Sequence, residues 1–386
     1  MKEAARILVI LTGGTICSLS GRSGKNKSAA KKTESYLADN YRASNSPFAN
    51  LAAFDYRSLD TDVLSENMTA AVLYELLGIF KSEENIERTY AGVILLHGTD
   101  TLAYTASFLS FALAGLSLPV CMVSAQLALK RKRKIEENGR TRVITEDEPS
   151  TNGYANFRAA TELILNGIAP NVYAVYRNMD GKLLVHLGAH LLQCPNGSDD
   201  FHSRDEMTVP DPQNASLAGV RFESDRAYYR QVKKEAGEVL LLHPHTNLNY
   251  AALDLRAYRA VIHGTYHSES VCIGRPSADQ HAKQKEYYTL DMLKEEDRPY
   301  SILSLLSACK EREIPLFLAP CDKKSFKYGT TANALKCGAI PLSCITLESA
   351  YAKALFGIML GKRGRALSMF MRKSINYEFC PIAFQF

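Results

Sequence analysis

Nearly continuous apolar segments alternate with helical patterns along this chain of 386 residues, and this alternation constrains the fold more than any other feature. Four apolar segments in the first half have the composition of buried strands: residues 7–11, 91–97, 119–125 and 171–176. Three helical patterns separate or follow them: residues 69–80, 101–114 and 155–165. This order predicts an α/β fold with a mostly parallel sheet and helices on both of its faces.

The second half of the chain repeats the alternation. Predicted strands occupy residues 239–242, 260–262 and 316–319. Predicted helices run from residue 291 or 300 to 311, over 331–337, and over 346–360. Because a domain has ~100–200 residues, we predict a larger N-terminal α/β domain over 1–215, a linker over 216–236 and a smaller C-terminal α/β domain over 237–386.

Composition excludes several classes of protein. The chain has 46 basic and 41 acidic residues, so its formal charge is 46 − 41 = +5, and we expect no nucleic-acid partner. No segment approaches the ~20 apolar residues of a membrane span, and the apolar start is too short for a signal peptide. The cysteine count is odd, at nine, and no Cys-x-x-Cys pair occurs. We therefore predict a cytoplasmic protein without disulfides, metal or cofactor.

Two polar segments interrupt the alternation. Residues 21–45 are rich in Lys, Ser, Ala and Asn, and we predict a long mobile loop there. Residues 130–142 form a charged insert that begins Lys-Arg-Lys-Arg-Lys. A solvated surface loop is one interpretation of this insert. A loop that contacts RNA is the other, although no interleaved aromatic residues support it.

The first chemically suggestive segment is Thr12-Gly13-Gly14-Thr15, directly after the first strand. The two glycines let the backbone turn sharply and approach a ligand. Thr15 is then presented at the carboxyl end of a parallel strand, where ligands bind in open α/β sheets. The segment lacks the spacing of a phosphate-binding loop. A simple Gly-Gly turn is the alternative interpretation.

The second segment is His97-Gly98-Thr99-Asp100-Thr101, where a buried strand passes into a helix. Its Thr and Asp residues could cap that helix. However, both segments follow strands of one predicted sheet, so two hydroxyls and a carboxylate are expected to converge on one crevice. This combination suits a threonine nucleophile with a second threonine and a carboxylate beside it.

These motifs, in this order, resemble the bacterial-type L-asparaginase family, most closely its cytoplasmic type I branch. Four further stretches match the family pattern: 64–69, 124–126, 151–160 and 328–350. The resemblance extends over roughly residues 6–365. It implies the two-domain asparaginase architecture and hydrolysis of L-asparagine to L-aspartate and ammonia through an acyl-enzyme ester.

The resemblance also implies roles for single residues. Thr15 is the expected nucleophile, and Thr99 orients water or relays a proton. Asp100 binds the α-amino group of the substrate. The remaining substrate-binding positions are Ser65 for the α-carboxylate, Glu66 for the amino group, and Ala125, whose segment receives the substrate amide.

One departure from the family pattern affects catalysis. The family has a lysine that forms a triad with the second threonine and the aspartate, and the alignment places Leu192 at that position. Lys182 and His190 are the candidate substitutes. Relatives also close the site with a tyrosine on the mobile loop, for which Tyr36 and Tyr41 are candidates.

Two other functions stay open, and the missing lysine favours the second of them. The chain could be a glutaminase or an ammonia-supplying relative of amidotransferase type. It could also be a catalytically impaired paralogue that binds an amino acid but lacks the family lysine. By resemblance we expect a homodimer or homotetramer.

Overall fold

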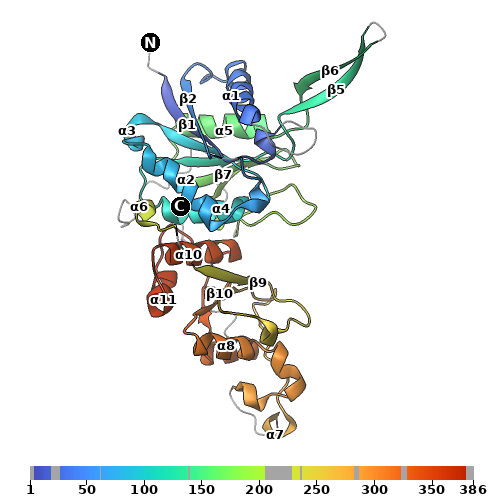
Figure 1. Cartoon of the computed structure of the whole chain (residues 1–386), viewed down its shortest axis with the longest axis vertical. Coiled ribbons are helices and arrows are strands. Elements are labelled where there is room, and N and C mark those ends of the chain that lie inside the picture. Colours follow the sequence, from blue (N-terminus) through green and yellow to red (C-terminus); the bar gives the residue numbers. More distant parts are fainter. Residues whose placement is uncertain are drawn as a thin grey trace. The chain divides into compact units, whose positions relative to one another are not determined.

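The computed structural model describes residues 4–18, 27–60, 62–137, 140–204, 228–234, 237–281, 287–322 and 328–379. The chain forms two compact units, Met1–Gln231 and Val232–Phe386, each with its own sheet (Figure 1). Most of the predicted linker 216–236 lies outside the described residues, so the predicted domain limits stay a prediction. Within the described residues, no helix is long and apolar enough to cross a membrane.

The first unit is built on a six-stranded sheet in the order β2-β1-β3-β4-β7-β8. Its strands are β1 (Ala5–Leu11), β2 (Ala52–Ser58), β3 (Gly92–Leu96), β4 (Val120–Val123), β7 (Val172–Arg177) and β8 (Leu183–Leu187). All pairings are parallel except that of β7 with the edge strand β8. The four predicted strands of the first half are therefore confirmed, and so is the predicted mostly parallel α/β class.

Helices cover both faces of this sheet (Figure 1). The helices of this unit are α1 (Lys27–Arg42), α2 (Ala70–Ser82), α3 (Ile86–Thr89), α4 (Leu102–Ala112), α5 (Gly153–Leu165) and α6 (Tyr228–Gln231). Residues of α1 and α5, such as Leu37 and Phe157, share one buried apolar cluster with Ile7 and Ile94 of the sheet. Helix α4 packs on β7 from the other face. Every residue of β3 is consequently buried.

The predicted mobile loop over 21–45 is wrong for most of its length, because residues 27–42 form helix α1. Residues 19–26 lie outside the described part of the chain. The apolar content of the segment is low, but Leu37 and Tyr41 are buried against the sheet, and this packing is enough to order a helix. Tyr36 lies under the Lys130 ammonium, 4.7 Å from the ring centroid. Neither candidate tyrosine therefore lies on a loop.

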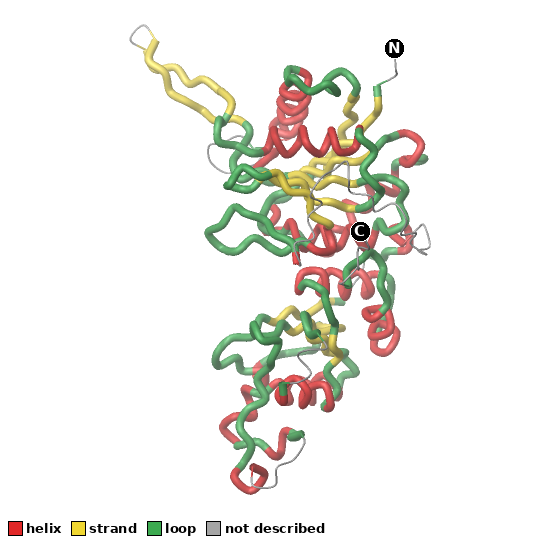
Figure 2. The backbone as a smooth tube through the Cα atoms, turned by 180° about the vertical axis from the view of Figure 1, so that it is seen from behind, coloured by secondary structure: helices red, strands yellow, loops and turns green. Residues whose placement is uncertain are grey.

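The charged insert is not a loop either. It forms an antiparallel hairpin of β5 (Lys130–Glu137) and β6 (Arg140–Asp147), which projects from the first unit (Figure 2). Opposite charges meet across its two strands: Lys130 with Asp147 at 2.7 Å and Arg131 with Glu146 at 2.8 Å. These cross-strand pairs explain how so polar a segment adopts a regular structure.

The second unit contains a four-stranded parallel sheet in the order β12-β11-β10-β9. Its strands are β9 (Glu238–Leu242), β10 (Tyr258–His263), β11 (Leu316–Leu318) and β12 (Ile340–Pro341). Its helices are α7 (Ala278–His281), α8 (Ile302–Glu311), α9 (Gly329–Lys336), α10 (Leu347–Met359) and α11 (Gly364–Arg372). The smaller C-terminal α/β fold is confirmed, and the helix before β11 begins at the later of its two predicted starts.

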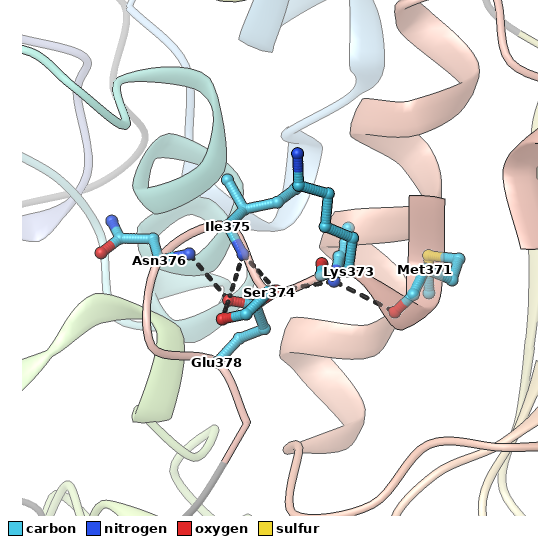
Figure 3. A network of polar contacts seen from close by, with 7 residues as sticks. Met371, Lys373, Ser374, Ile375, Asn376 and Glu378 are labelled. Atoms are coloured by element: carbon cyan, nitrogen blue, oxygen red, sulfur yellow. Dashed lines mark hydrogen bonds and ion pairs between the residues drawn. The ribbon is translucent and has the colours of Figure 1, made fainter. Parts of the chain in front are cut away.

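A buried ion pair fixes the last described segment of the second unit to α10. The Lys353 ammonium is fully buried and donates to Glu378 Oε1 at 2.6 Å and to two backbone carbonyls, those of Met371 and Lys373. Glu378 also accepts hydrogen bonds from the backbone N–H groups of Ile375 and Asn376 (Figure 3). Both charges are thus satisfied without water.

Candidate active site

The loop after β1 is held tightly between its neighbours. Thr12 donates from its backbone N (3.2 Å) and its hydroxyl (2.8 Å) to the Leu96 carbonyl at the end of β3. Gly13 and Gly14 have φ values of 122° and 80°, which favour glycine. A Cβ on Gly13 would lie 2.4 Å from the Val63 carbonyl oxygen. The sharp turn predicted from the two glycines is therefore present, and Thr15 follows it in a short 3₁₀ turn over Thr15–Cys17.

The loop after β3 lies directly beside this turn. A Cβ on Gly14 would be 2.6 Å from the Gly98 Cα, so the two backbones are in contact. A Cβ on Gly98 would in turn be 2.4 Å from Ser65 Oγ. Three sequence segments that carry predicted site residues therefore meet at Gly14, Gly98 and Ser65.

Ser65 and Asp100 form the polar centre of this junction. The Ser65 hydroxyl donates to Asp100 Oδ2 at 3.1 Å and accepts from the Asp100 backbone N at 3.2 Å. Thr101 is the N-cap residue of α4, but its side chain does not cap the helix and donates to the Ser65 carbonyl at 2.7 Å. The capping interpretation of this segment thus fails for Thr101, whose hydroxyl holds the loops together.

His97 precedes Gly98 in the chain and is fully buried. Burial lowers its pKa to about 4, so the ring is neutral at pH 7. Its Nδ1 lies 2.7 Å from the Gly98 carbonyl oxygen, which can only accept a hydrogen bond, so the Nδ1–H tautomer is present. The buried ring therefore forms a hydrogen bond with the Gly98 carbonyl and is not an exposed base.

Ala125 lies in a segment that two asparagines fix. It is fully buried after β4, and its neighbour Ser124 donates to the His97 carbonyl at 2.7 Å. Asn152 accepts from Gln126 N, and Asn156 donates to the Ser124 carbonyl. Both asparagines also bond to the backbone of Arg177 at the end of β7. The 151–160 stretch hence joins the carboxyl ends of β4 and β7.

Thr99 and Asp100 line a cavity of about 310 Å³. Its other lining residues are Tyr176, Phe201, Gln193 and the loop Cys194, Pro195, Asn196, Gly197, Ser198 and Asp199. Of the six predicted site residues, these two line it, whereas Thr15, Ser65, Glu66 and Ala125 do not. Glu66 is exposed beside Ser65, and Thr15 is half-buried.

The position expected for the family lysine has no basic side chain. Leu192 occupies it, and the next residue, Gln193, donates from Nε2 to the Thr99 carbonyl at 3.0 Å. The Gln193 Oε1 accepts from the Ala103 backbone N in α4 at 3.4 Å. A neutral amide therefore lies against the second threonine.

The two candidate substitutes for that lysine have other surroundings. Lys182 is exposed on the turn between β7 and β8 and forms an ion pair with Asp180 at 2.9 Å, which raises the pKa of Lys182. His190 is buried in the short turn Gly188–His190. Neither residue lines the cavity beside Thr99 and Asp100.

Tyr176 and Gln193 are two of the lining residues that the sequence did not predict as site residues. Tyr176 is fully buried near the carboxyl end of β7, and burial raises its pKa to about 12, so its hydroxyl stays protonated. Its place at the end of a buried parallel strand was a usable signal. Gln193 had none, because it follows β8 in an irregular segment. No group of three or more His, Cys, Asp or Glu residues suited to a metal ion occurs in the part of the chain that the structure describes.

Comparison with known proteins places this site in context. Residues 6–137 match the family model described as Asparaginase, N-terminal. A glutamyl-tRNA(Gln) amidotransferase subunit from Methanopyrus kandleri is 29% identical over 184 residues, which cover 46% of this chain and 35% of the relative. The chain thus spans about a third of that relative's length. The corresponding amidotransferase subunit from Pyrobaculum aerophilum is 25% identical over 333 residues, covering 83% of this chain and 69% of the relative.

Two solved structures share the fold. The thermostable L-asparaginase from Thermococcus kodakarensis superposes on this chain with a TM-score of 0.64 at 19% sequence identity. The superposition covers 97% of this chain and 99% of the Thermococcus chain. L-asparaginase I from Vibrio cholerae gives the same TM-score and identity, with 98% and 100% covered. At 19% sequence identity, these similarities show a shared fold and nothing further.

Proposed function

We propose that this protein is an amidohydrolase that converts L-asparagine and water into L-aspartate and ammonia, because residues 6–137 match the model of the asparaginase N-terminal domain. The resemblance that the motifs predicted is confirmed by this match. The matched range contains Thr15, Ser65, Glu66, Thr99, Asp100 and Ala125.

The junction of Gly14, Gly98 and Ser65 is the observation that supports the proposal most directly. Thr15 follows Gly14 and Thr99 follows Gly98, so backbone contact between the two glycines keeps both threonine-bearing loops adjacent. Asp100 is fixed by Ser65 from a third segment. These contacts support the proposal that a nucleophile, a second hydroxyl and a carboxylate lie on adjacent loops, as covalent catalysis requires.

In the proposed reaction, the Thr15 oxygen attacks the carboxamide carbon of asparagine. Backbone N–H groups around Thr15 and Thr99 stabilise the oxyanion that forms. The C–N bond then breaks, ammonia leaves with the proton taken from Thr15, and an acyl ester remains. Water oriented by Thr99 hydrolyses that ester to give aspartate and free Thr15.

Substrate recognition follows from charge. Asparagine has one ammonium and one carboxylate at its Cα, and buried charges require partners. We assign the ammonium to Asp100, with Glu66 as a second anion beside it, and the carboxylate to the Ser65 segment. Ala125 supplies a fixed backbone carbonyl for the substrate amide.

The experiment that tests this function is ammonia release from asparagine and from glutamine, with wild type beside Thr15→Ala and Asp100→Asn. We expect release by the wild type, none by Thr15→Ala, and weaker substrate binding by Asp100→Asn. Calorimetry with aspartate provides the control, because Thr15→Ala should still bind it. Ammonia release by Thr15→Ala at the wild-type rate would exclude Thr15 as the nucleophile.

A second candidate function has its own support. The relatives named above as amidotransferase subunits suggest that this chain releases ammonia for a partner enzyme. An asparaginase should act alone, whereas an ammonia-supplying subunit should release more ammonia when its partner is present. Ammonia release measured before and after adding a lysate depleted of this protein distinguishes the two.

A third candidate is the impaired paralogue. The neutral Gln193 at Thr99 and the exposed ion pair of Lys182 favour it, because a base near the nucleophile contributes ~10²–10⁴-fold to proton transfer. Saturable aspartate binding with no ammonia release at high enzyme concentration would establish this function. Light scattering on the same samples tests the proposed homodimer or homotetramer.

A further inference from the structure

An arginine-lined pocket in the second unit has no role in the function proposed above. Its volume is about 730 Å³. Five arginines line it: Arg256, Arg259, Arg312, Arg363 and Arg365. One acidic residue, Glu313, also lines it. The charges of these six side chains sum to 5 − 1 = +4. Because all lining residues belong to the second unit, the pocket shares none with the candidate active site.

The topology of the unit brings these arginines together. Arg256 and Arg259 lie at the start of β10, and Arg312 lies between α8 and β11. Since β10 and β11 are parallel, both segments are at the amino edge of the sheet. Arg363 is the N-cap residue of α11, and Arg365 lies in its first turn. This edge is opposite to the carboxyl edge at which ligands of open α/β sheets ordinarily bind.

The protein neutralises only part of the positive charge in the pocket. Arg256 pairs with Asp254 at 2.6 Å and Arg312 with Glu311 at 3.7 Å. Within the described part of the chain, Arg259 donates to the backbone carbonyls of Arg256 and Tyr258, and Arg363 donates to those of Ile358 and Lys362. Among the described residues, Arg259, Arg363 and Arg365 form no ion pair. Burial and the nearby charge of Arg259 lower the pKa of Arg363, which indicates that the two cations repel each other.

Two other features of the pocket favour an anionic ligand. Arg363, Gly364 and Arg365 are the N-terminal end of α11, which no side chain caps, so the positive end of the helix dipole adds to the field of the arginines. Tyr258 and the buried Leu255 and Ile314 contribute a less polar part of the lining.

We propose that this pocket binds a small anion that carries two or more phosphate groups, either inorganic polyphosphate or a nucleoside di- or triphosphate. The planar guanidinium group binds phosphate oxygens through two parallel hydrogen bonds, and several such groups can share a chain of phosphates. Three of the arginines form no ion pair among the described residues, and a single carboxylate would neutralise only part of their charge. The volume is in the range of small-molecule sites, ~300–1,000 Å³.

Calorimetric titration of the full chain with tripolyphosphate and with ATP, both without magnesium and at low salt, tests the proposal. We expect saturable binding that weakens as the salt concentration rises. The double variant Arg259→Gln/Arg365→Gln should bind tripolyphosphate at least ~10-fold more weakly, because it loses two charged hydrogen-bond donors. Arg372→Gln, at the far end of the same helix, is the matched control and should bind within about twofold of wild type.

The comparison of the two ligands identifies the source of the phosphates. Tighter binding of ATP than of tripolyphosphate, with the difference removed by Tyr258→Ala, assigns the pocket to a nucleotide. Equal affinity assigns it to inorganic polyphosphate. No saturable binding of either ligand, or equal affinity in wild type and a folded double variant, would overturn the proposal. The readout is independent of ammonia release, so the proposed hydrolysis can fail without affecting this result.

Discussion

At the scale of single residues, Gly98 is the position where a small change should disrupt the junction most. A Cβ there would lie 2.4 Å from Ser65 Oγ and 2.8 Å from Ser65 Cβ, so Gly98→Ala must displace Ser65 from Asp100. We expect a loss of ~1–3 kcal/mol in the free energy of unfolding, together with weaker aspartate binding. Urea unfolding and calorimetry measure the two effects.

The chain offers a control for this substitution. Gly78 lies inside α2, and a Cβ there would meet no atom within 4 Å. Gly78→Ala should therefore stabilise the protein by ~0.4–1 kcal/mol and leave aspartate binding unchanged. If both alanine variants behave alike, the close approach of Gly98 to Ser65 is not what holds the junction.

Gln193 permits a test of the missing base. Its amide contacts the Thr99 carbonyl, one residue after the position where relatives have lysine. Gln193→Lys would place an amine beside Thr99, and we expect ammonia release from asparagine to increase by at least ~10-fold if a base is what limits the wild type. Gln193→Met, which has similar length and no charge, is the control. A rate equal to that of Gln193→Met would show that proton transfer does not limit the reaction.

At the scale of elements, the sequence predicted the strands that are buried on both faces of the sheet. Strands such as β3 and β4 consist of apolar residues only, and their composition requires burial. Helix α1 was missed because its polar composition resembles a loop and only a few side chains, such as Leu37, anchor it. The β5–β6 hairpin was missed because its order comes from cross-strand ion pairs, which no local pattern reveals.

The attachment of the last described segment to α10 leads to a prediction about stability. Lys353→Met would leave the Glu378 carboxylate buried without its cation, at a cost of ~3–5 kcal/mol in the free energy of unfolding. Adding Glu378→Gln should recover part of this loss, because the amide oxygen can still accept from Ile375 N and Asn376 N without a buried charge.

Urea unfolding of both single variants and the double variant measures the coupling. Lys373→Met, at an exposed neighbouring lysine, is the control and should change stability by less than ~0.5 kcal/mol. A double variant no more stable than Lys353→Met would show that the buried charge is not the source of the loss.

At the scale of the whole molecule, the topology of the sheet explains why candidate site residues that directly follow neighbouring parallel strands lie close together. Strands β1 and β3 are parallel neighbours, so the segments that contain Thr15 and Thr99 leave the sheet at one edge. This much could be predicted from the order of elements. The contact of Gln193 with Thr99 joins residues 94 positions apart and depends on an irregular segment after the edge strand β8. Neither periodicity nor composition specifies such a contact.

Acid should destabilise both units of the molecule through their buried histidines. Burial lowers the pKa of His97, His186 and His263 to about 4, whereas an unfolded histidine titrates near 6.5. Between these values the unfolded chain binds more protons than the folded chain, so the free energy of unfolding falls as the pH decreases from about 6.5 to about 4. Each histidine contributes up to ~3 kcal/mol, fully present above pH 6.5 and lost near pH 4.

The local contacts of His263 agree with a neutral ring in the folded protein. The Tyr250 hydroxyl lies 2.8 Å from Nε2, and the Gly264 carbonyl oxygen lies beside Nδ1, so the ring donates from Nδ1 and accepts at Nε2. A proton on Nε2 would remove the acceptor that the tyrosine uses. The free energy of unfolding, measured with urea between pH 7 and pH 4.5, should therefore decline less steeply with falling pH in His263→Phe than in wild type. The difference in slope should correspond to the uptake of up to one proton. His267→Gln, at an exposed histidine, should keep the wild-type slope, and a wild-type slope in His263→Phe would contradict the assignment of a neutral buried ring.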